Sequence, residues 1–271
     1  MPGSDPIRID DPDDPRIAHY RDIREKDLSG REGLFIAEGK VVLGVLFAAR
    51  RFEAQSVLLL ENRVAGMQET LARAPVGMPV YVASREVIDR IAGFHLHRGI
   101  LALGRRRGPE RPAALLGNLP ERALVVALVG ISNHDNVGAI FRNAAAFGAD
   151  AIVLDETCCD PLYRKAIRVS VGAALKVPFT RDGDTDTVMA ALEEAGFSVL
   201  ALSPAGKFEI ADLGSAARTA LVFGTEGEGL PAALLARLET VRIGMAPGFD
   251  SLNVAAASAV ALHHLWRKRT G

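Results

Sequence analysis

Cysteine is almost absent from this chain of 271 residues, and the two cysteines that occur, Cys158 and Cys159, are neighbours. Adjacent cysteines cannot supply the spaced disulfide framework that stabilises small secreted domains. No apolar run reaches the roughly 18 residues that a membrane span needs, and the N-terminus lacks the basic and then apolar segments of a signal peptide. We therefore expect a cytoplasmic protein without a membrane partner.

Groups typical of metal sites and phosphate loops are also missing. His95 and His97 alternate, and His263 and His264 are adjacent, but no cysteine or carboxylate completes a zinc ligand set, so we expect no metal. The P-loop pattern does not occur, and the G-x-G-x-x-G fingerprint is absent where a Rossmann fold would need it. A nicotinamide-dependent enzyme is therefore disfavoured, and it stays an alternative because Asp155 ends a predicted strand.

The formal net charge of −1 hides an uneven distribution along the chain. Residues 1–16 carry 2 basic and 5 acidic residues, and their Asp- and Pro-rich composition predicts a disordered tail. Residues 17–107 carry 15 basic and 10 acidic residues, whereas residues 108–271 carry 15 basic and 18 acidic residues. The basic excess of the first half is suited to attracting phosphate groups.

Residues 17–107 are predicted to form a small α/β domain, and residues 108–120, rich in Gly, Pro and Arg, are predicted to be a linker. Apolar periodicity in the first domain predicts one helix and several short strands. The helix is expected over 38–49, and the strands over 34–37, 57–60, 80–82 and 100–103.

Residues 121–271 alternate between nearly continuous apolar strands and helices, which predicts a mostly parallel sheet covered by helices on both faces. Ligands of such sheets bind at the carboxyl ends of the strands, where this chain has four unusual loops rich in glycine or proline. The expected strands are 124–129, 151–154, 198–202, 220–223 and 240–243, and the expected helices are 136–147, 161–170, 184–195, 231–238 and 253–267.

Three segments of this second half resemble, in order, the motifs of the SpoU/TrmH family of RNA ribose 2′-O-methyltransferases in the SPOUT superfamily. They are "NVGAIFRNAAAFG" from residue 136, "LVFGTEGEGLP" from residue 221 and "IGMAPGFDSLNVAAASAV" from residue 243. The resemblance covers residues 120–268. It implies S-adenosyl-L-methionine bound in a deep trefoil knot, and a homodimer whose active site is completed across the subunit interface.

The first domain, with "FIAEG" at residues 35–39, resembles more loosely the L30e-like substrate-binding domain that many members of this family place first. The resemblance implies an RNA substrate, with ribosomal RNA expected and transfer RNA as the runner-up. A non-catalytic RNA-binding or ribosome-assembly protein of the same fold is the alternative. Among the basic residues, RNA contacts are expected at Arg24, Lys26, Arg31, Arg164 and Arg168.

The family motifs also assign site residues. The resemblance implies that the cofactor is held largely by backbone groups of Leu202, Gly224, Ile243, Met245 and Leu252. It places the polar residues of catalysis at Asn136, Arg142, Glu226, Ser251 and Asn253. The chain departs from the family at one position, since it has Thr225 where many members have Asn or Ser.

Several of these polar residues also have a purely structural interpretation. Asn136 and Asn253 could each cap a helix, and Glu226 could be a solvated loop carboxylate. Arg164 and Arg168 are four residues apart on one helix face, which could contact phosphate or simply be solvated. We expect Asn136 and Asn253 to serve both roles, and for Arg142 the motif context favours the functional interpretation over a surface residue of an amphipathic helix.

Arg142 stands among small residues instead of acidic partners. The resemblance suggests a general base at this position, but a guanidinium pKa of about 12.5 or higher leaves almost no neutral form near pH 7. A fixed cation can instead orient the attacking oxygen and stabilise its developing charge, an effect worth about 3–4 kcal/mol for one comparable donor. We therefore expect a cationic role for Arg142, and Gly138, Ala145 and Ala146 would leave room for a ribose.

Overall fold

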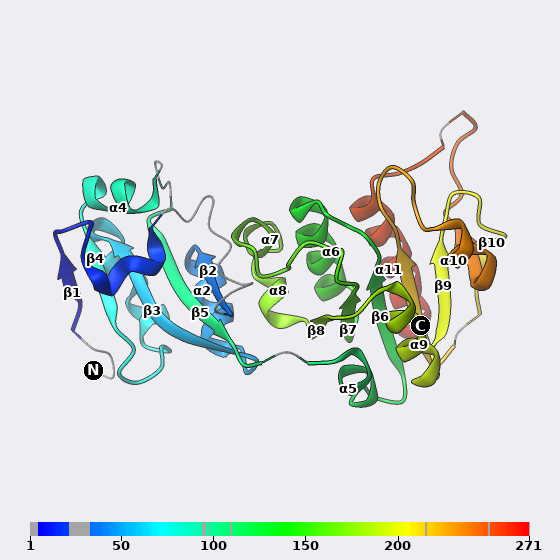
Figure 1. Cartoon of the computed structure of the whole chain (residues 1–271), viewed down its shortest axis with the longest axis horizontal. Helices are drawn as coiled ribbons and strands as arrows, with labels where there is room; N and C mark the ends of the chain where they lie inside the picture. Colours follow the sequence, from blue (N-terminus) through cyan, green and yellow to red (C-terminus); the bar gives the residue numbers. More distant parts are fainter. Residues whose placement is uncertain are drawn as a thin grey trace. The chain divides into compact units, whose positions relative to one another are not determined.

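The computed structural model describes residues 5–21, 33–93, 96, 98–108, 110–214, 216–248 and 250–270 (Figure 1). The chain forms two compact units. The first comprises Met1–Gly108 and Leu162–Lys176, and the second comprises Pro109–Pro161 and Val177–Gly271. The segment Leu162–Lys176 therefore leaves the second unit after one of its strands, joins the first unit and returns.

The first unit is built on a five-stranded sheet in the order β1-β4-β3-β5-β2. Strands β1, β4 and β3 are parallel, and β5 runs antiparallel to both β3 and β2. The strands are β1 (Ile7–Ile9), β2 (Leu34–Glu38), β3 (Phe52–Leu60), β4 (Val80–Ala83) and β5 (Ile100–Arg106). The helices are η1 (Pro15–Tyr20), α2 (Lys40–Ala48), η2 (Glu61–Arg63), α3 (Val64–Leu71), α4 (Arg85–Ala92), α7 (Arg164–Val169) and α8 (Ala173–Lys176).

The prediction of a disordered tail over residues 1–16 is wrong for the part that the structure describes. Strand β1 pairs with β4, and Ile9 is buried in the core of this unit. Helix η1 follows, capped by the Asp14 carboxylate, and it adds Ile17 and Tyr20 to the same core. Composition alone was misleading here, because Ile7 and Ile9, with one residue between them, place both apolar side chains on one face of a strand that pairs with β4.

The second unit contains a seven-stranded sheet in the order β10-β12-β9-β11-β6-β7-β8, and every neighbouring pair is parallel. This confirms the predicted α/β fold with a parallel sheet. The strands are β6 (Ala123–Leu128), β7 (Ala151–Leu154), β8 (Phe179–Arg181), β9 (Ser198–Leu202), β10 (Phe208–Glu209), β11 (Arg218–Phe223) and β12 (Glu239–Arg242). The trefoil knot implied by the resemblance stays a prediction.

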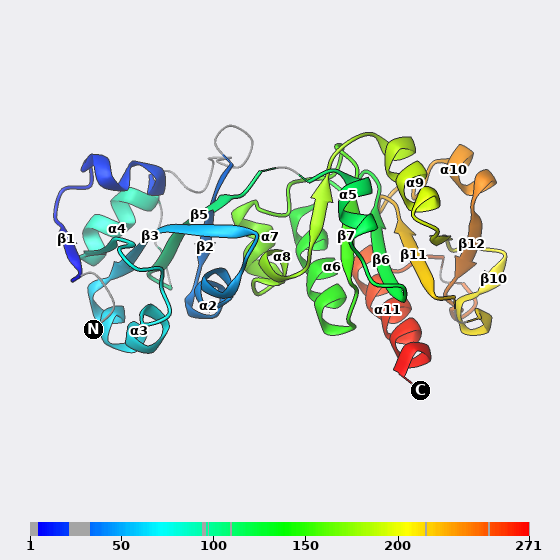
Figure 2. The same cartoon turned by 90° about the horizontal axis from the view of Figure 1, so that it is seen from below.

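Helices cover both faces of this sheet (Figure 2). Helices α6 (His134–Ala146) and α11 (Val254–Thr270) lie side by side on one face, and α5 (Pro112–Gly117), α9 (Thr185–Glu194) and α10 (Ala232–Arg237) lie on the other. A short helix, η3 (Ile210–Asp212), follows β10. The Asn143 side chain joins α6 to α11, because it donates hydrogen bonds to the Ala255 carbonyl at 2.8 Å and to Ser258 Oγ at 2.9 Å.

The segment 108–120, predicted as a linker, contains helix α5. Pro112 occupies its first turn, where a missing N–H costs nothing. Leu115 and Leu116 belong to the main core of the second unit. Within the residues that the structure describes, no helix is long and apolar enough to cross a membrane.

Candidate active site

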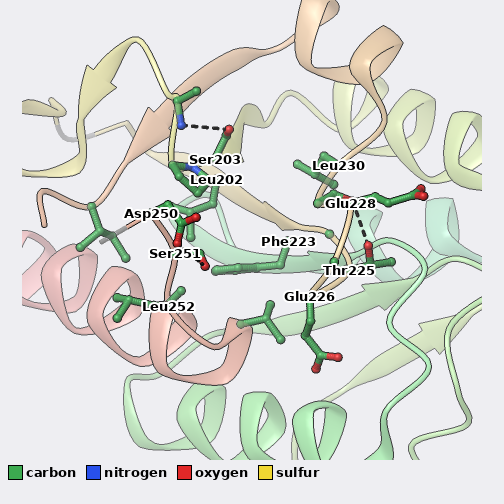
Figure 3. A pocket seen from close by; sticks show the side chains of 18 of the residues that line it. Leu202, Ser203, Phe223, Thr225, Glu226, Glu228, Leu230, Asp250, Ser251 and Leu252 are labelled. Carbon is green, nitrogen blue, oxygen red and sulfur yellow. Dashed lines mark hydrogen bonds between the residues drawn. The ribbon is translucent and has the colours of Figure 1, made fainter. Parts of the chain in front are cut away.

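A pocket of about 440 Å³ opens at the carboxyl ends of β9, β11 and β12 (Figure 3). Its walls come from the loops after these strands, from α10 and from the first turn of α11, at residues 202–205, 223–230, 235, 243, 245, 250–252, 254 and 257. The volume lies within the range of roughly 300–1,000 Å³ that is typical of small-molecule sites. Of the four loops predicted from the strand pattern, those after β9, β11 and β12 meet around this cavity, whereas the loop after β6 does not line it.

All five residues expected to hold a cofactor line this pocket, and most contribute an apolar wall. Leu202, Ile243 and Met245 are half-buried. Leu252 is 43% exposed, so a large apolar side chain is available to a ligand at the mouth. A half-buried aliphatic wall of this kind is suited to an adenine ring.

The glycine-rich loop after β11 folds against itself. A Cβ atom on Gly224 would lie 2.4 Å from the carbonyl carbon of Gly229, so no side chain fits there. Thr225 N–H and its hydroxyl each donate to the Gly229 carbonyl at 3.3 Å, and Gly229 has a φ of +73°. Gly224 and Gly229 are therefore required by the loop's own backbone, the first for space and the second for its positive φ. A Cβ on Gly227 would have no atom within 4 Å.

The turn after β9 is equally tight. A Cβ on Gly206 would lie 2.3 Å from the carbonyl carbon of Val241 in β12, and Gly206 N–H donates to the Ser203 carbonyl at 3.0 Å. Ser203 is half-buried and lines the pocket. The rim of the cavity is thus made of two loops whose shapes are determined by backbone packing.

Of the five residues expected in catalysis, only Glu226 and Ser251 line the pocket. Asn253 instead donates from Nδ2 to Oδ1 of Asn136 at 3.1 Å, and its own Oδ1 accepts from Ala255 N–H at 2.9 Å. Asn253 therefore caps α11 while it joins this helix to α6. Asn136 is buried inside α6 and does not cap it, since the side chain of Asn133 does so.

Arg142 is exposed on α6 and does not line the pocket. Among the described residues, no hydrogen bond or ion pair holds its guanidinium. The buried face of α6 is formed by its neighbours, including Gly138, Ile140 and Phe141. The single chain therefore presents Arg142 as an available cation without bringing it to the cavity.

Asp155, which kept the nicotinamide alternative open, is buried and used internally. Its carboxylate accepts hydrogen bonds from Gly130 N–H (3.2 Å), from the Thr157 hydroxyl (2.7 Å) and N–H (3.2 Å), from Cys158 N–H (3.1 Å) and from the Thr185 hydroxyl (2.9 Å). Burial acts to raise the pKa of Asp155, but these hydrogen bonds outweigh it and hold the pKa below its usual value. The carboxylate is therefore not available to bind a ribose.

The two cysteines are free thiols, as expected from their spacing. Burial raises the pKa of Cys159 to about 12 and that of Cys158 further, so both stay protonated near neutral pH. Among the residues that the structure describes, no group of His, Cys, Asp or Glu is arranged to hold a metal ion.

The expected RNA-binding residues fall into two groups. Arg24, Lys26 and Arg31 lie outside the described residues. In the first unit, Arg164 forms an ion pair with Glu38 at 2.7 Å, with the two side chains only 14% and 6% exposed, and Arg168 lies 3.8 Å from the same carboxylate. The Arg164 guanidinium is thus largely held by a buried carboxylate that no motif or pattern in the sequence indicated.

The sequence of the second unit matches a known protein family. The profile of the SpoU rRNA Methylase family matches residues 123–263, which span the parallel sheet and all three segments around the pocket. This chain belongs to the SpoU methylase family. The motif resemblance seen in the sequence is therefore confirmed.

Relatives extend the similarity to the whole chain. A protein of Mycobacterium bovis named as an uncharacterized tRNA/rRNA methyltransferase is 42% identical over 99% of this chain and 94% of its own length. A similarly named protein of Mycolicibacterium paratuberculosis is 33% identical over 76% of this chain and 68% of its own length.

Solved structures share the fold at lower identity. An AdoMet-bound rRNA methyltransferase from Sinorhizobium meliloti superposes with a TM-score of 0.80 at 24% identity, covering 96% of this chain and 97% of the other. The SpoU methyltransferase AviRb from Streptomyces viridochromogenes, in complex with AdoMet, gives 0.82 at 21% identity, covering 94% and 98%.

Proposed function

We propose that this protein transfers a methyl group from S-adenosyl-L-methionine to a ribose 2′-hydroxyl of a structured RNA, with ribosomal RNA as the expected substrate. The pocket carries the proposal, since it combines an aliphatic wall with Glu226, Glu228 and Asp250, and none of its described lining residues is Lys, Arg or His. A dinucleotide would bring phosphates into a site without cations. S-adenosyl-L-methionine brings an adenosine, a sulfonium and an ammonium, and no phosphate.

The residues present fit this cofactor. Leu202, Ile243 and Met245 would pack against the adenine, and the backbone groups of the two tight loops would bind its polar edge. When bound, the cofactor supplies an electrophilic methyl group. The names of the relatives, tRNA/rRNA methyltransferase, support RNA as the acceptor.

We propose a homodimer because Arg142 is exposed away from the pocket. The surface formed by α6 and α11 also exposes Val260 (45%) and Trp266 (41%), which are large apolar side chains. A second copy covering this surface would bury them and bring an Arg142 to each pocket, where the cation stabilises the attacking oxygen. Trp266 is the only tryptophan of the chain, so its fluorescence reports this interface directly.

We propose the first unit as the RNA-binding, L30e-like part. The register of β3 and β5 pairs Phe52 with Arg106 at one end of the sheet, where residues 50–51 and 105–107 are all arginine. Arg50, Arg105 and Arg107 are exposed there. Exposed guanidinium groups gathered at one strand end are suited to a phosphate backbone.

Two measurements test the proposal. Calorimetric titration with S-adenosyl-L-methionine and with NAD should show binding of the first alone, and a chain that binds NAD but not S-adenosyl-L-methionine would refute it. Transfer of a labelled methyl group to purified ribosomal or transfer RNA, followed by mapping of 2′-O-methylation, identifies the acceptor. Modification of a base, or binding of RNA without any transfer, would refute the ribose reaction.

A further inference from the structure

The charge of the pocket is uniform in sign. Among the lining residues that the structure describes, the ionisable side chains are the carboxylates of Glu226, Glu228 and Asp250. The first two lie on the loop after β11, and Asp250 lies across the cavity beside Ser251 (Figure 3). The ligand would therefore sit between carboxylates on two sides.

Among the described residues, no ion pair compensates these charges. Within the part of the chain that the structure describes, neither Glu226 nor Glu228 forms an ion pair or side-chain hydrogen bond. Asp250 accepts only a long hydrogen bond from the Ser251 hydroxyl, at 3.5 Å. All three side chains are exposed at the mouth, where their field reaches the cavity and is weakened by water and salt.

Methyl transfer changes the charge of the bound cofactor. The C–S bond breaks with its electron pair staying on sulfur, a lone pair of the ribose oxygen forms the new O–C bond, and the hydroxyl proton leaves to solvent. The positive charge of the sulfonium thus departs as a proton, and S-adenosyl-L-homocysteine carries one positive charge fewer than the methyl donor. The two molecules otherwise differ by one methyl group.

We propose that Glu228 and Asp250 are specificity residues. They make this pocket prefer S-adenosyl-L-methionine, whose sulfonium is positively charged, over S-adenosyl-L-homocysteine, whose thioether sulfur is neutral. The inference rests on the proposed function and deepens it. A negative site stabilises the sulfonium by Coulomb attraction and gives the thioether no such gain. Each turnover therefore lowers the affinity of the site for its own occupant, which promotes product release.

The expected size follows from the geometry. Carboxylates on opposite walls of a cavity of this volume lie on the order of 10 Å or less from its centre, where one unit charge at an effective dielectric constant of about 40 changes affinity about four-fold. Removing two such charges should lower the ratio of donor affinity to product affinity by about sixteen-fold at low salt, and by less at high salt.

The test uses the full chain and the double variant Glu228→Gln, Asp250→Asn. Its matched control is Glu193→Gln, Glu194→Gln, which removes two exposed carboxylates on α9 that do not line the pocket. Both variants are titrated calorimetrically with S-adenosyl-L-methionine, S-adenosyl-L-homocysteine and sinefungin at low and high salt. Sinefungin carries an ammonium in place of the methylsulfonium, so it separates charge from the methyl group.

We expect the pocket variant to lose preference for both cationic ligands while product affinity stays within about two-fold, and the α9 variant to behave as wild type. An unchanged ratio in the pocket variant, with all three ligands still binding, would overturn the inference and leave the proposed function standing. A sinefungin affinity that follows the product instead of the methyl donor would also overturn it. Failure of the wild-type chain to bind any of the three would overturn the proposed function itself.

Discussion

Asp155 is the residue whose replacement tests the structure most directly. It is buried at the end of β7 and accepts hydrogen bonds from three backbone N–H groups and two threonine hydroxyls. In Asp155→Ala the two threonine hydroxyls can rotate to other acceptors, but the backbone N–H groups of Gly130, Thr157 and Cys158 lose the carboxylate that accepts their hydrogen bonds. At roughly 1–3 kcal/mol for each unsatisfied buried group, with Cys158 N–H keeping a second acceptor, we expect a loss of about 4 kcal/mol in the free energy of unfolding.

The assay is thermal unfolding, followed by circular dichroism and calorimetry. A loss of about 4 kcal/mol should lower the Tm of a unit of this size by about 8–16 °C. Asp182→Asn is the control, because this exposed aspartate has no side-chain hydrogen bond within the described residues and should shift the Tm by less than about 2 °C. Equal Tm values for Asp155→Ala and wild type would refute the conclusion that the Asp155 carboxylate stabilises the segments at the carboxyl ends of β6 and β7.

The same carboxylate predicts a pH dependence. Because the folded pKa of Asp155 lies below its usual value, its contribution is fully present above about pH 4 and is lost as the pH falls through the folded pKa. The difference in stability between wild type and Asp155→Asn should therefore shrink on acidification below pH 4. A difference that grows on acidification would contradict the lowered pKa.

Three further predictions concern the site and the first unit. Arg142→Ala should lower methyl transfer at least about 100-fold and leave affinity for S-adenosyl-L-methionine within several-fold; unchanged turnover would show that the arginine is only structural. Glu38→Gln should cost about 3 kcal/mol in unfolding free energy, because it leaves Arg164 buried without its carboxylate, while the exposed control Glu86→Gln should be neutral; equal urea midpoints would contradict the buried ion pair. Arg105→Gln with Arg107→Gln should weaken RNA binding several-fold and reduce the slope of log affinity against log salt by about 1.5, and an unchanged slope would place RNA elsewhere.

The strand pattern predicted much of the second unit. All five predicted strands correspond to β6, β7, β9, β11 and β12. Four of them contain a run of four or more apolar residues, whereas the segment 240–243 that overlaps β12 alternates polar and apolar residues. Strands β8 and β10 were missed because they have only three and two residues, too few to show a pattern. The predicted helix over 161–170 is shorter, at Arg164–Val169, and its grouping with the first unit has no local signal.

The sequence by itself predicted that the loops after β9, β11 and β12 lie together, because parallel strands joined by helices bring their carboxyl ends to one edge of the sheet. Only the tertiary structure showed that the fourth predicted loop, after β6, stays outside the pocket. The sequence did not determine which polar side chains remain available there. Asp155 is occupied by donors from three segments, Asn253 by α6 and its own helix, and Arg164 by Glu38, 126 residues away along the chain. Such partners are set by sheet order and helix packing, so only the tertiary structure separates the side chains held by buried partners from Glu226, Glu228, Asp250 and Arg142, which are exposed and form no ion pair within the described chain.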